Sequence, residues 1–266
     1  MSDLRLAGRE VAKGLFMRVL VVSDIHSNSV ALNAIRERFD VCFCLGDLVD
    51  YGPDPSGCVQ WVMQNRCETV RGNHDHGVAH SVEVHGETGF RYLTSVTRPL
   101  QWQHLDAAQR KFLARLPVTR RVEVDGVRYL LVHGTPRDPL DEYLRKDASA
   151  WAEVVKDLQA DVVCVGHSHM QFELTAGKTR ILNPGSVGLP RDGDTRAAYA
   201  IIENGKIQLM RVAYDIEKAI GLSDALPLPD DAKLMYRTCL THGRLRPPET
   251  PQVPPQPAGG IWETKA

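Results

Sequence analysis

Apolar residues in the first part of the chain form short continuous runs, separated by stretches in which apolar residues have a helical spacing. The runs are predicted strands and lie at 17–23, 41–45 and 68–71. The stretches between them are predicted helices and lie at 31–39 and 58–65. Continuous apolar strands that alternate with helices are typical of βαβ units around a buried parallel sheet. From about 79 to 116 the pattern is helical, with little strand signal.

The second half of the chain contains more predicted strands than helices. These strands lie at 118–124, 127–133, 162–166, 172–176, 180–185, 197–203 and 206–212. Asp125-Gly126 and Asn204-Gly205 separate two pairs of them and are typical of two-residue hairpin turns. A parallel βαβ half followed by antiparallel hairpins predicts an α/β fold, a four-layer α-β-β-α sandwich with two mixed β-sheets flanked by helices.

The chain is predicted to form one folded domain with a short segment at each end. Residues 17–244 contain no repeat and no low-complexity linker, so we expect them to form that domain. Residues 1–16 are a polar N-terminal extension, and we expect either that Met17 is the natural start or that the extension is a disordered, loosely held tail. Six of the eleven residues from Pro247 to Pro257 are proline, which predicts a Pro-rich, disordered C-terminal tail at 245–266.

The composition argues against several classes of partner. Of the 266 residues 43% are hydrophobic, and 32 Lys and Arg balance 33 Asp and Glu to a formal net charge of −1. This balance argues against binding to nucleic acid or to an anionic membrane surface. No run approaches the roughly 18 apolar residues of a membrane span, and the first residues lack the apolar region of a signal peptide. Six cysteines without CxxC spacing favour reduced thiols in the cytoplasm, and the pattern defines no oligomeric state.

Five of the predicted strands end in residues that can bind metal ions. The segments are Asp24-Ile25-His26, Gly46-Asp47, Gly72-Asn73-His74-Asp75, His133-Gly134 and Gly166-His167-Ser168-His169. Sheets of α/β proteins place ligand sites at the carboxyl ends of strands, and side chains two residues apart on extended backbone point to one side. Imidazole and carboxylate together favour Mn, Fe, Zn or Ni over Ca or Mg. Each segment alone is common in loops without metal, but their combination predicts a metal site.

In this order, the five segments resemble the motifs of the calcineurin-like metallophosphoesterase superfamily. Two later segments, at 183–188 and 190–194, resemble its small single-domain bacterial and archaeal phosphodiesterase-like branch. The resemblance extends from about residue 17 to about residue 215. Ser168 stands where the family often has Thr, and Ser27 where Gly is frequent, but neither position is a predicted metal ligand.

The resemblance implies a site for two divalent metal ions, chosen among Mn, Fe, Zn and Ni. One ion would be bound by Asp24, His26, Asp47 and His169, and the other by Asp47, Asn73, His133 and His167. Asp47 would be shared, because the two oxygens of a carboxylate can span ions about 3.5–4 Å apart. Two divalent ions and two carboxylates leave a local charge of about +2, which attracts an anionic phosphate ester. A hydroxide that bridges the ions would then attack phosphorus in line.

The resemblance also implies roles for residues that do not bind metal. His74 would be the general acid that protonates the leaving group, and Asp75 would orient its ring; the alternative for His74 is a structural role behind the ligands. Asn28, Ser186 and Arg191 are candidates for binding substrate, and a surface role is an equal alternative for Arg191. Tyr51 is expected to pack in the core. No role is predicted for the remaining histidines, His76, His80, His85, His104 and His242.

The implied function is hydrolysis of phosphate esters, with a phosphodiesterase favoured. The alternatives are a phosphomonoesterase, including a protein Ser/Thr phosphatase, and a non-catalytic scaffold that keeps the fold and binds partners. A nuclease is less favoured, because the sequence contains no basic run and no aromatic platform for single strands. The presence of all seven ligand positions together with His74 favours an enzyme over a scaffold.

Overall fold

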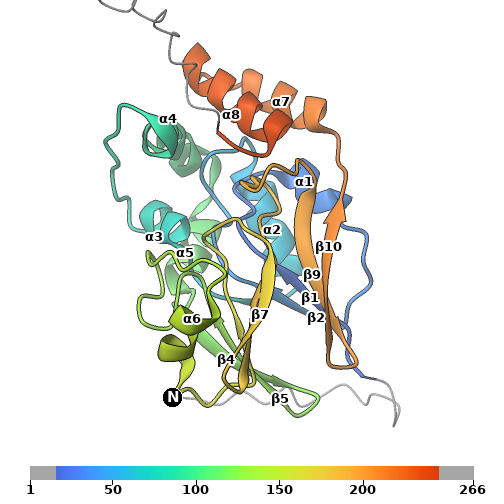
Figure 1. Ribbon diagram of the computed structural model, residues 1–266. Coiled ribbons are helices and arrows are strands. Elements are labelled where there is room, and N and C mark those ends of the chain that lie inside the picture. Colours follow the sequence, from blue (N-terminus) through green and yellow to red (C-terminus); the bar gives the residue numbers. More distant parts are fainter. Residues whose placement is uncertain (1–15, 246–266) are drawn as a thin grey trace, which may run out of the picture.

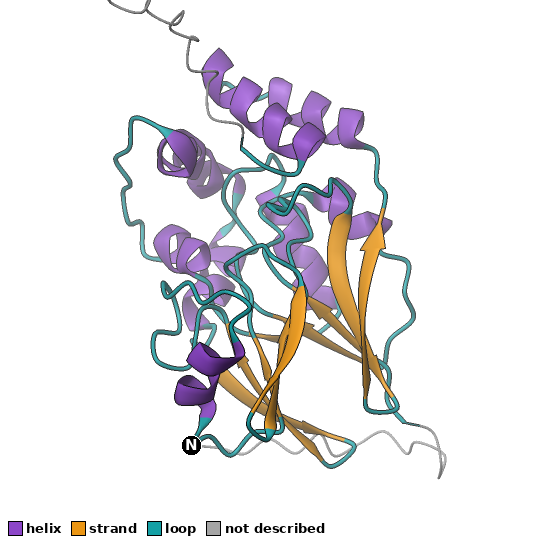
Figure 2. Cartoon of the chain, in the orientation of Figure 1, coloured by secondary structure: helices purple, strands orange, loops and turns teal. Residues whose placement is uncertain are grey.

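The computed structural model describes residues 16–245, which form two packed β-sheets with helices on their outer faces (Figure 1 and Figure 2). The predicted extension at 1–16 and the predicted tail at 245–266 lie outside the described residues, apart from Phe16 and Leu245. Within the described range, no helix has both the length and the apolar character that crossing a membrane requires.

The first sheet has the strand order β10-β9-β1-β2-β3. Its strands are β1 (Val19–Val22), β2 (Val41–Cys44), β3 (Glu68–Thr69), β9 (Ala197–Glu203) and β10 (Lys206–Val212). The pairs β1–β2 and β2–β3 are parallel, as the alternation with helices predicts, whereas β9 runs antiparallel to both β1 and β10. The sheet is therefore mixed.

The second sheet has the order β4-β5-β6-β8-β7. Its strands are β4 (Thr119–Val124), β5 (Val127–Val132), β6 (Val162–Cys164), β7 (Phe172–Ala176) and β8 (Thr179–Asn183). Here β5, β6 and β8 are parallel neighbours, and β4 and β7 pair antiparallel at the two edges. This sheet is also mixed.

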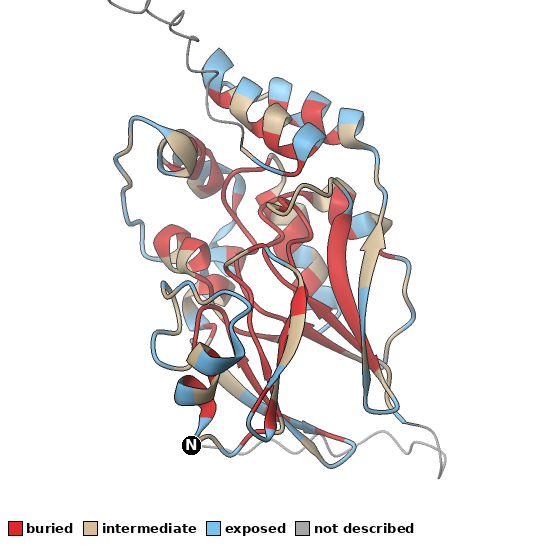
Figure 3. Ribbon diagram, viewed as in Figure 1, coloured by how far each residue is buried: buried red, intermediate tan, exposed pale blue. Residues whose placement is uncertain are grey.

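Alternate residues of the central strands point into two different apolar layers. Val21 packs with Leu131 in the cluster between the sheets, whereas Leu20 packs with Leu32 of α1 on the outer face of the first sheet. On the outer face of the second sheet, Trp151 of α6 is buried in a third cluster. The central strands are accordingly buried on both faces (Figure 3). The predicted α-β-β-α sandwich is confirmed.

The helices cover the sheets and close the space above the strand ends. Their bounds are α1 (Ser29–Ala34), α2 (Pro55–Gln64), α3 (Asn73–Ala79), α4 (Gly89–His104), α5 (Ala107–Arg115), α6 (Ala148–Val155), α7 (Ile216–Asp224) and α8 (Asp230–His242). Leu93 of α4, Ile220 of α7 and Tyr236 of α8 form an apolar cluster that includes Tyr51. Helix α4 and the C-terminal pair α7 and α8 therefore reach the segment that follows β2.

One predicted helix is shorter than its sequence pattern indicates. The apolar spacing predicts a helix over 31–39, but α1 ends at Ala34, and Ile35 has extended backbone. The residues that follow are held instead by Arg18, whose side chain donates hydrogen bonds to the Arg38 carbonyl and to Glu37. These contacts tie the segment to the start of β1 and outweigh its helical propensity.

Both predicted hairpin turns are present. Asp125 and Gly126 have φ values of 52° and 77°, and Asn204 and Gly205 have values of 53° and 72°. Two successive positive φ angles define the turn that matches the twist of a two-residue hairpin.

Candidate active site

Six of the seven predicted metal ligands come together as two groups of buried side chains at strand ends. Asp24, His26 and His169 form one group, and Asp47, His133 and His167 form the other. They follow β1, β2, β5 and β6, so both sheets contribute. This is the edge at which the sequence pattern predicts a metal site.

The backbone at these positions adopts a conformation that is unusual for residues with side chains. Asp24, His26, Asp47, His167 and His169 have φ values between 46° and 62°, in the left-handed region. Such strain persists only where the surrounding structure determines it, and it occurs preferentially at functional sites. A left-handed residue immediately after a strand turns the chain sharply and aims the side chain across the end of the sheet.

The histidine rings are oriented by backbone carbonyls. Nδ1–H of His26 donates to the Val49 carbonyl at 3.0 Å, and Nδ1–H of His169 donates to the Leu189 carbonyl. Burial lowers the pKa of both rings well below 6.5, so they are neutral. With the proton on Nδ1, each Nε2 carries a lone pair that is free to bind a metal.

These lone pairs face each other, which fits a cation between them. Nε2 of His26 lies 3.1 Å from Nε2 of His169, a distance at which two unprotonated nitrogens repel. The Asp24 carboxylate lies 3.3 Å from His169 Nε2, and its Oδ1 is buried with no hydrogen-bond partner among the described residues. Three acceptor atoms that converge without a donor suit a divalent ion.

The second group is arranged around the charge of Asp47. Nε2 of His133 lies 3.1 Å from Asp47 Oδ2 and 3.2 Å from Nδ1 of His167. Burial lowers the pKa of His133, but the charge and hydrogen bond of Asp47 outweigh burial and raise the pKa to about 9. The site thus stabilises positive charge at this position, and a divalent ion would supply it in place of the proton.

Asp47 faces both groups through one oxygen. Its Oδ2 lies 3.1 Å from His133 Nε2 and 3.7 Å from His26 Nε2, whereas its Oδ1 accepts the backbone N–H of His74 at 2.9 Å. Asp47 is thus placed to be the ligand that two ions would share, while the N–H of His74 also binds one of its oxygens.

Asn73 is positioned as a further ligand. It is the first residue of α3, and its Oδ1 is buried with no hydrogen-bond partner among residues 16–245. A buried amide oxygen without a donor is rare in folded proteins unless a ligand, ion or water occupies the position. The close approach of this turn to Asp47 requires Gly72, because a Cβ there would lie 2.0 Å from Asp47 Oδ1.

His74 is held by Asp50, and the prediction that Asp75 orients its ring is wrong. Nδ1–H of His74 donates to Asp50 Oδ2 at 2.7 Å. Asp75 instead accepts the backbone N–H groups of Asp47, Leu48 and Gly72 at 2.8, 2.8 and 3.0 Å. The reason is its place as the third residue of α3, from which an acidic side chain reaches back to unpaired backbone donors.

Asp50, Arg98 and Tyr51 form the contacts around His74, and the sequence motifs do not identify them as site residues. Arg98 is 5% exposed and donates two hydrogen bonds to Asp50 Oδ2, so it fixes the carboxylate that holds His74. The Tyr51 hydroxyl lies 3.1 Å from His74 Nε2. The sequence feature that could have identified Asp50 is its position in the short loop between Gly46 and Gly52, near the predicted ligand Asp47. No sequence feature could have identified Arg98.

A model of the "Calcineurin-like phosphoesterase superfamily domain" matches residues 17–206, which include all the ligand positions. The chain belongs to this superfamily. It is therefore a metal-dependent hydrolase of phosphate esters. The two ligand groups are where this phosphoesterase would hold its metal.

Similar proteins span nearly the same length as the phosphoesterase domain. The uncharacterized protein MJ0912 of Methanocaldococcus jannaschii is 35% identical over 228 residues, covering 76% of this chain and 89% of the relative. The metallophosphoesterase structure from Sphaerobacter thermophilus has a TM-score of 0.72 and 30% identity, covering 86% of this chain and 99% of that one. Phosphodiesterase YfcE of Escherichia coli is 25% identical over 207 residues, covering 73% of this chain and 91% of YfcE.

Two of the three predicted substrate contacts of this phosphoesterase are used within the protein. Asn28 accepts the N–H of Ala31 and donates to the Gly188 carbonyl, both at 3.0 Å. Ser186 donates to the Asp24 carbonyl at 2.7 Å and accepts the N–H of Leu189 at 2.8 Å. Both side chains are buried, so they hold the ligand-bearing loops in place rather than face a substrate.

Arg191 remains a candidate for contact with substrate. Its guanidinium carbon lies 3.9 Å from the centre of the Phe90 ring, and its Nε is buried with no hydrogen-bond partner among the described residues. Burial, and after it the charge of Arg191, lower the pKa of His169. The guanidinium is thus close enough to the first ligand group to act on it.

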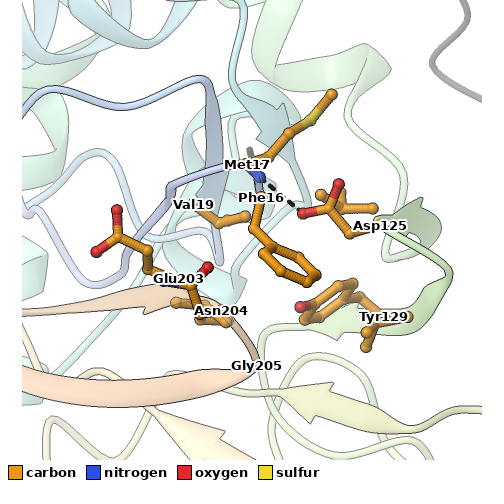
Figure 4. A pocket seen from close by; sticks show the side chains of 11 residues that line it. Phe16, Met17, Val19, Asp125, Tyr129, Glu203, Asn204 and Gly205 are labelled. Carbon is orange, nitrogen blue, oxygen red and sulfur yellow. Dashed lines mark hydrogen bonds between the residues drawn. The ribbon is translucent and has the colours of Figure 1, made fainter. Parts of the chain in front are cut away.

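A small cavity lies at the opposite end of the sandwich, beside the two hairpin turns. It has a volume of about 150 Å³ and is bounded by Phe16, Met17, Asp125, Tyr129 and Asn204 together with apolar strand residues (Figure 4). The backbone N–H of Met17 donates to Asp125 at 2.7 Å. The metal-ligand groups found within residues 16–245 do not include any of these side chains, so this cavity is separate from the active site.

The close approach of α3 and α4 gives a testable prediction. A Cβ on Gly77 would lie 2.2 Å from Nη1 of Arg98, so Gly77→Ala should displace the guanidinium and loosen Asp50 and His74. We expect kcat for esters with poor leaving groups to fall roughly tenfold or more, because misplacement by about 1 Å can reduce a rate about a hundredfold. Metal content, measured by elemental analysis, should not change.

The matched control is Gly221→Ala in α7, where a Cβ would meet nothing within 4 Å. That variant should keep full activity and gain about 0.5–1 kcal/mol in unfolding free energy. Equal activity of Gly77→Ala and wild type would contradict the proposed link between Arg98 and His74.

Proposed function

We propose that the protein is a phosphodiesterase that uses two divalent metal ions and His74 as general acid. The observation that carries this proposal is the junction at Asp47. Its Oδ2 faces both ligand groups, and its Oδ1 accepts the N–H of His74, the residue whose ring is held by Asp50. A metal site and a proton donor that share one carboxylate suit the cleavage of a P–O bond.

The donor set supports two ions with borderline preference, such as Mn, Fe, Zn or Ni. Asp24, His26 and His169 would hold one, and Asn73, His133 and His167 the other, with Asp47 between them. When bound, such ions acidify water to a nucleophile at neutral pH and offset the charge of the phosphate. Among the six side chains of the two groups, Asp24 and Asp47 are the carboxylates, so two bound ions would leave positive charge that attracts anions.

His74 is placed to move a proton. Asp50 accepts Nδ1–H, which fixes the ring and leaves Nε2 to carry the proton that the leaving oxygen receives. The ring is 8% exposed and lines a cavity, so a substrate can reach it. The Tyr51 hydroxyl lies beside Nε2 and holds the ring from the other side.

Arg191 would bind a non-bridging phosphate oxygen. Its guanidinium packs on Phe90, which limits its motion while leaving donors free. The name of YfcE supports a preference for diesters, since that relative is called a phosphodiesterase and most of both chains align.

The test is an activity panel on metal-stripped protein supplied separately with Mn, Fe, Zn and Ni. The substrates are phosphomonoesters, linear and cyclic phosphodiesters, dinucleoside polyphosphates and a phosphopeptide. We expect metal-dependent hydrolysis with the highest kcat/KM on a diester. A higher value on a monoester or on the phosphopeptide would favour the phosphatase alternative, and a protein that binds no metal and hydrolyses nothing would be a scaffold.

A further inference from the structure

A cavity of about 430 Å³ opens beside His74. Asn73 and His74 contribute to its wall, so it begins at the proposed metal site and extends past the proposed proton donor. In an in-line displacement the leaving group departs opposite the attacking oxygen, on the side of the general acid. The cavity is therefore placed to receive the leaving alcohol, and its size is in the range of small-molecule sites.

Three separate segments bring aromatic rings to this cavity. Tyr51 comes from the loop after β2, Phe90 from the first turn of α4, and Tyr143 from the loop between β5 and α6. The Tyr51 and Phe90 rings lie 5.7 Å apart, centre to centre. Tyr51 is 3% exposed and one face of Phe90 is covered by the Arg191 guanidinium, so these two rings contribute apolar wall rather than a stacking surface. The ring that can stack on a planar group is that of Tyr143.

Tyr143 is the most exposed of the three. Its ring packs on His167 with 3.8 Å between centres, yet the residue is 59% exposed. The loop that carries it is held by backbone hydrogen bonds from Gly134 to Pro139 at 2.8 Å and from Thr135 to Asp138 at 2.9 Å. An ordered aromatic ring that lies on a metal-ligand candidate and remains open to solvent is available to stack on a ligand.

The rest of the lining suits an uncharged group. Val82 and Leu140 add apolar surface, and Val82 is 44% exposed. Asp50 pairs with Arg98 and balances its charge. The other charged side chains of the wall are Arg91, which is positive, and Glu83 and Asp141, which are negative. Arg191 lies on the ring of the lining residue Phe90, so two positive and two negative side chains surround the cavity and neither sign is in excess. The carboxylates can accept hydrogen bonds from hydroxyl or amino donors.

We propose that this cavity binds a planar aromatic ring on the leaving alcohol, so that the substrates are phosphate esters of ring-bearing alcohols such as nucleosides. The proposal rests on the function proposed above and specifies its substrate class. Water adds its oxygen to phosphorus, the P–O bond to the ring-bearing alcohol breaks, and that alcohol leaves with the proton from His74. The remaining ester group stays on the phosphate.

The products of a mixed diester test this assignment. Adenosine 5′-methyl phosphate can release adenosine or methanol, and both are primary alcohols. We expect adenosine and methyl phosphate, with ¹⁸O from labelled water in the methyl phosphate. Release of methanol and adenosine monophosphate would overturn the proposal. Two further diesters are compared with it. Benzyl methyl phosphate has a simple aromatic ring on its leaving alcohol, and glycerol 3-methyl phosphate has no ring.

The three diesters also show whether the cavity binds any aromatic ring or specifically a nucleoside. If kcat/KM for the adenosine and benzyl esters both exceed the glycerol ester about tenfold or more, the cavity selects any planar ring. If only the adenosine ester exceeds the glycerol ester by this factor, the cavity selects nucleosides. Equal values for all three would reject the inference while leaving the phosphodiesterase intact, whereas hydrolysis of none of these diesters, nor of any diester in the activity panel, would reject the proposed function.

Binding without metal provides an independent measurement. Saturation-transfer NMR of metal-free protein should detect adenosine or benzyl alcohol but not glycerol. Tyr143→Ala should weaken that binding about fivefold or more, as loss of a stacking contact does, and Tyr143→Phe should retain it. Leu234→Ala removes a 63% exposed side chain on α8 and should change nothing. Equal binding by Tyr143→Ala and Tyr143→Phe would overturn the role of the ring.

Discussion

Asp47→Asn should reduce bound metal from two ions per chain to one or none and lower kcat/KM at least about a thousandfold. The substitution keeps the shape of the side chain and an oxygen that can accept the N–H of His74, so the fold should survive. It removes the negative charge at Oδ2, which lies 3.1 and 3.7 Å from ligand nitrogens of the two groups. Losing several kcal/mol of transition-state stabilisation corresponds to about a thousandfold or more in rate.

The measurement is elemental analysis after metal loading, combined with steady-state kinetics on the best diester. Asp157→Ala is the control, because Asp157 is an exposed residue of the segment after α6. It should match wild type in both metal content and rate. Two tightly bound ions in Asp47→Asn would show that Asp47 is not the shared ligand.

His74→Ala should lower kcat for alkyl phosphodiesters about 10²- to 10⁴-fold, the usual contribution of a general acid. An activated ester with a nitrophenolate leaving group needs little protonation, so its hydrolysis should fall much less. The metal content should be unchanged, because the groups of side chains that can hold the ions do not include His74. The test is the slope of log kcat against leaving-group pKa, which should be steeper in the variant.

Asp50→Asn provides a second variant of the same unit, since it removes the charge that Nδ1 of His74 and Arg98 both contact. This variant should show part of the steeper dependence of log kcat on leaving-group pKa, although the imidazole ring of His74 is still present. His104→Ala, which removes an exposed histidine at the end of α4, is the matched control. A uniform loss over good and poor leaving groups in His74→Ala would assign His74 a structural role.

The fold and the place of the site follow from the sequence because both depend on local patterns. Apolar runs with turn residues between them define strands, and the carboxyl ends of parallel strands meet at one edge. This brings together the residues that follow β1 and β2 in one sheet and those that follow β5 and β6 in the other, and the packing of the two sheets joins the two sets.

The supporting contacts could not be predicted because they depend on how distant segments pack. Arg98 reaches Asp50 across 48 positions, and only the packing of α4 brings it there. Asp75 stands next to His74 in the sequence, yet the helix that begins at Asn73 directs its carboxylate to backbone donors. Asn28 and Ser186 match family positions, but the loops that they hold together use their polar atoms.

The contacts of Asp47 with both metal-ligand groups and with the backbone of His74 have a consequence for how substrate specificity can change. In the proposed mechanism, one carboxylate would set the position of the proton donor relative to the metal-bound phosphate. The length of a P–O bond hardly varies among phosphate esters, so this part of the site can serve all of them without change. The alcohol would instead be recognised by the segment between α3 and α4 and by the loop that carries Tyr143, both of which line the proposed alcohol cavity. Substitutions in those two segments can alter which ester is cleaved while the chemistry of cleavage stays as it is.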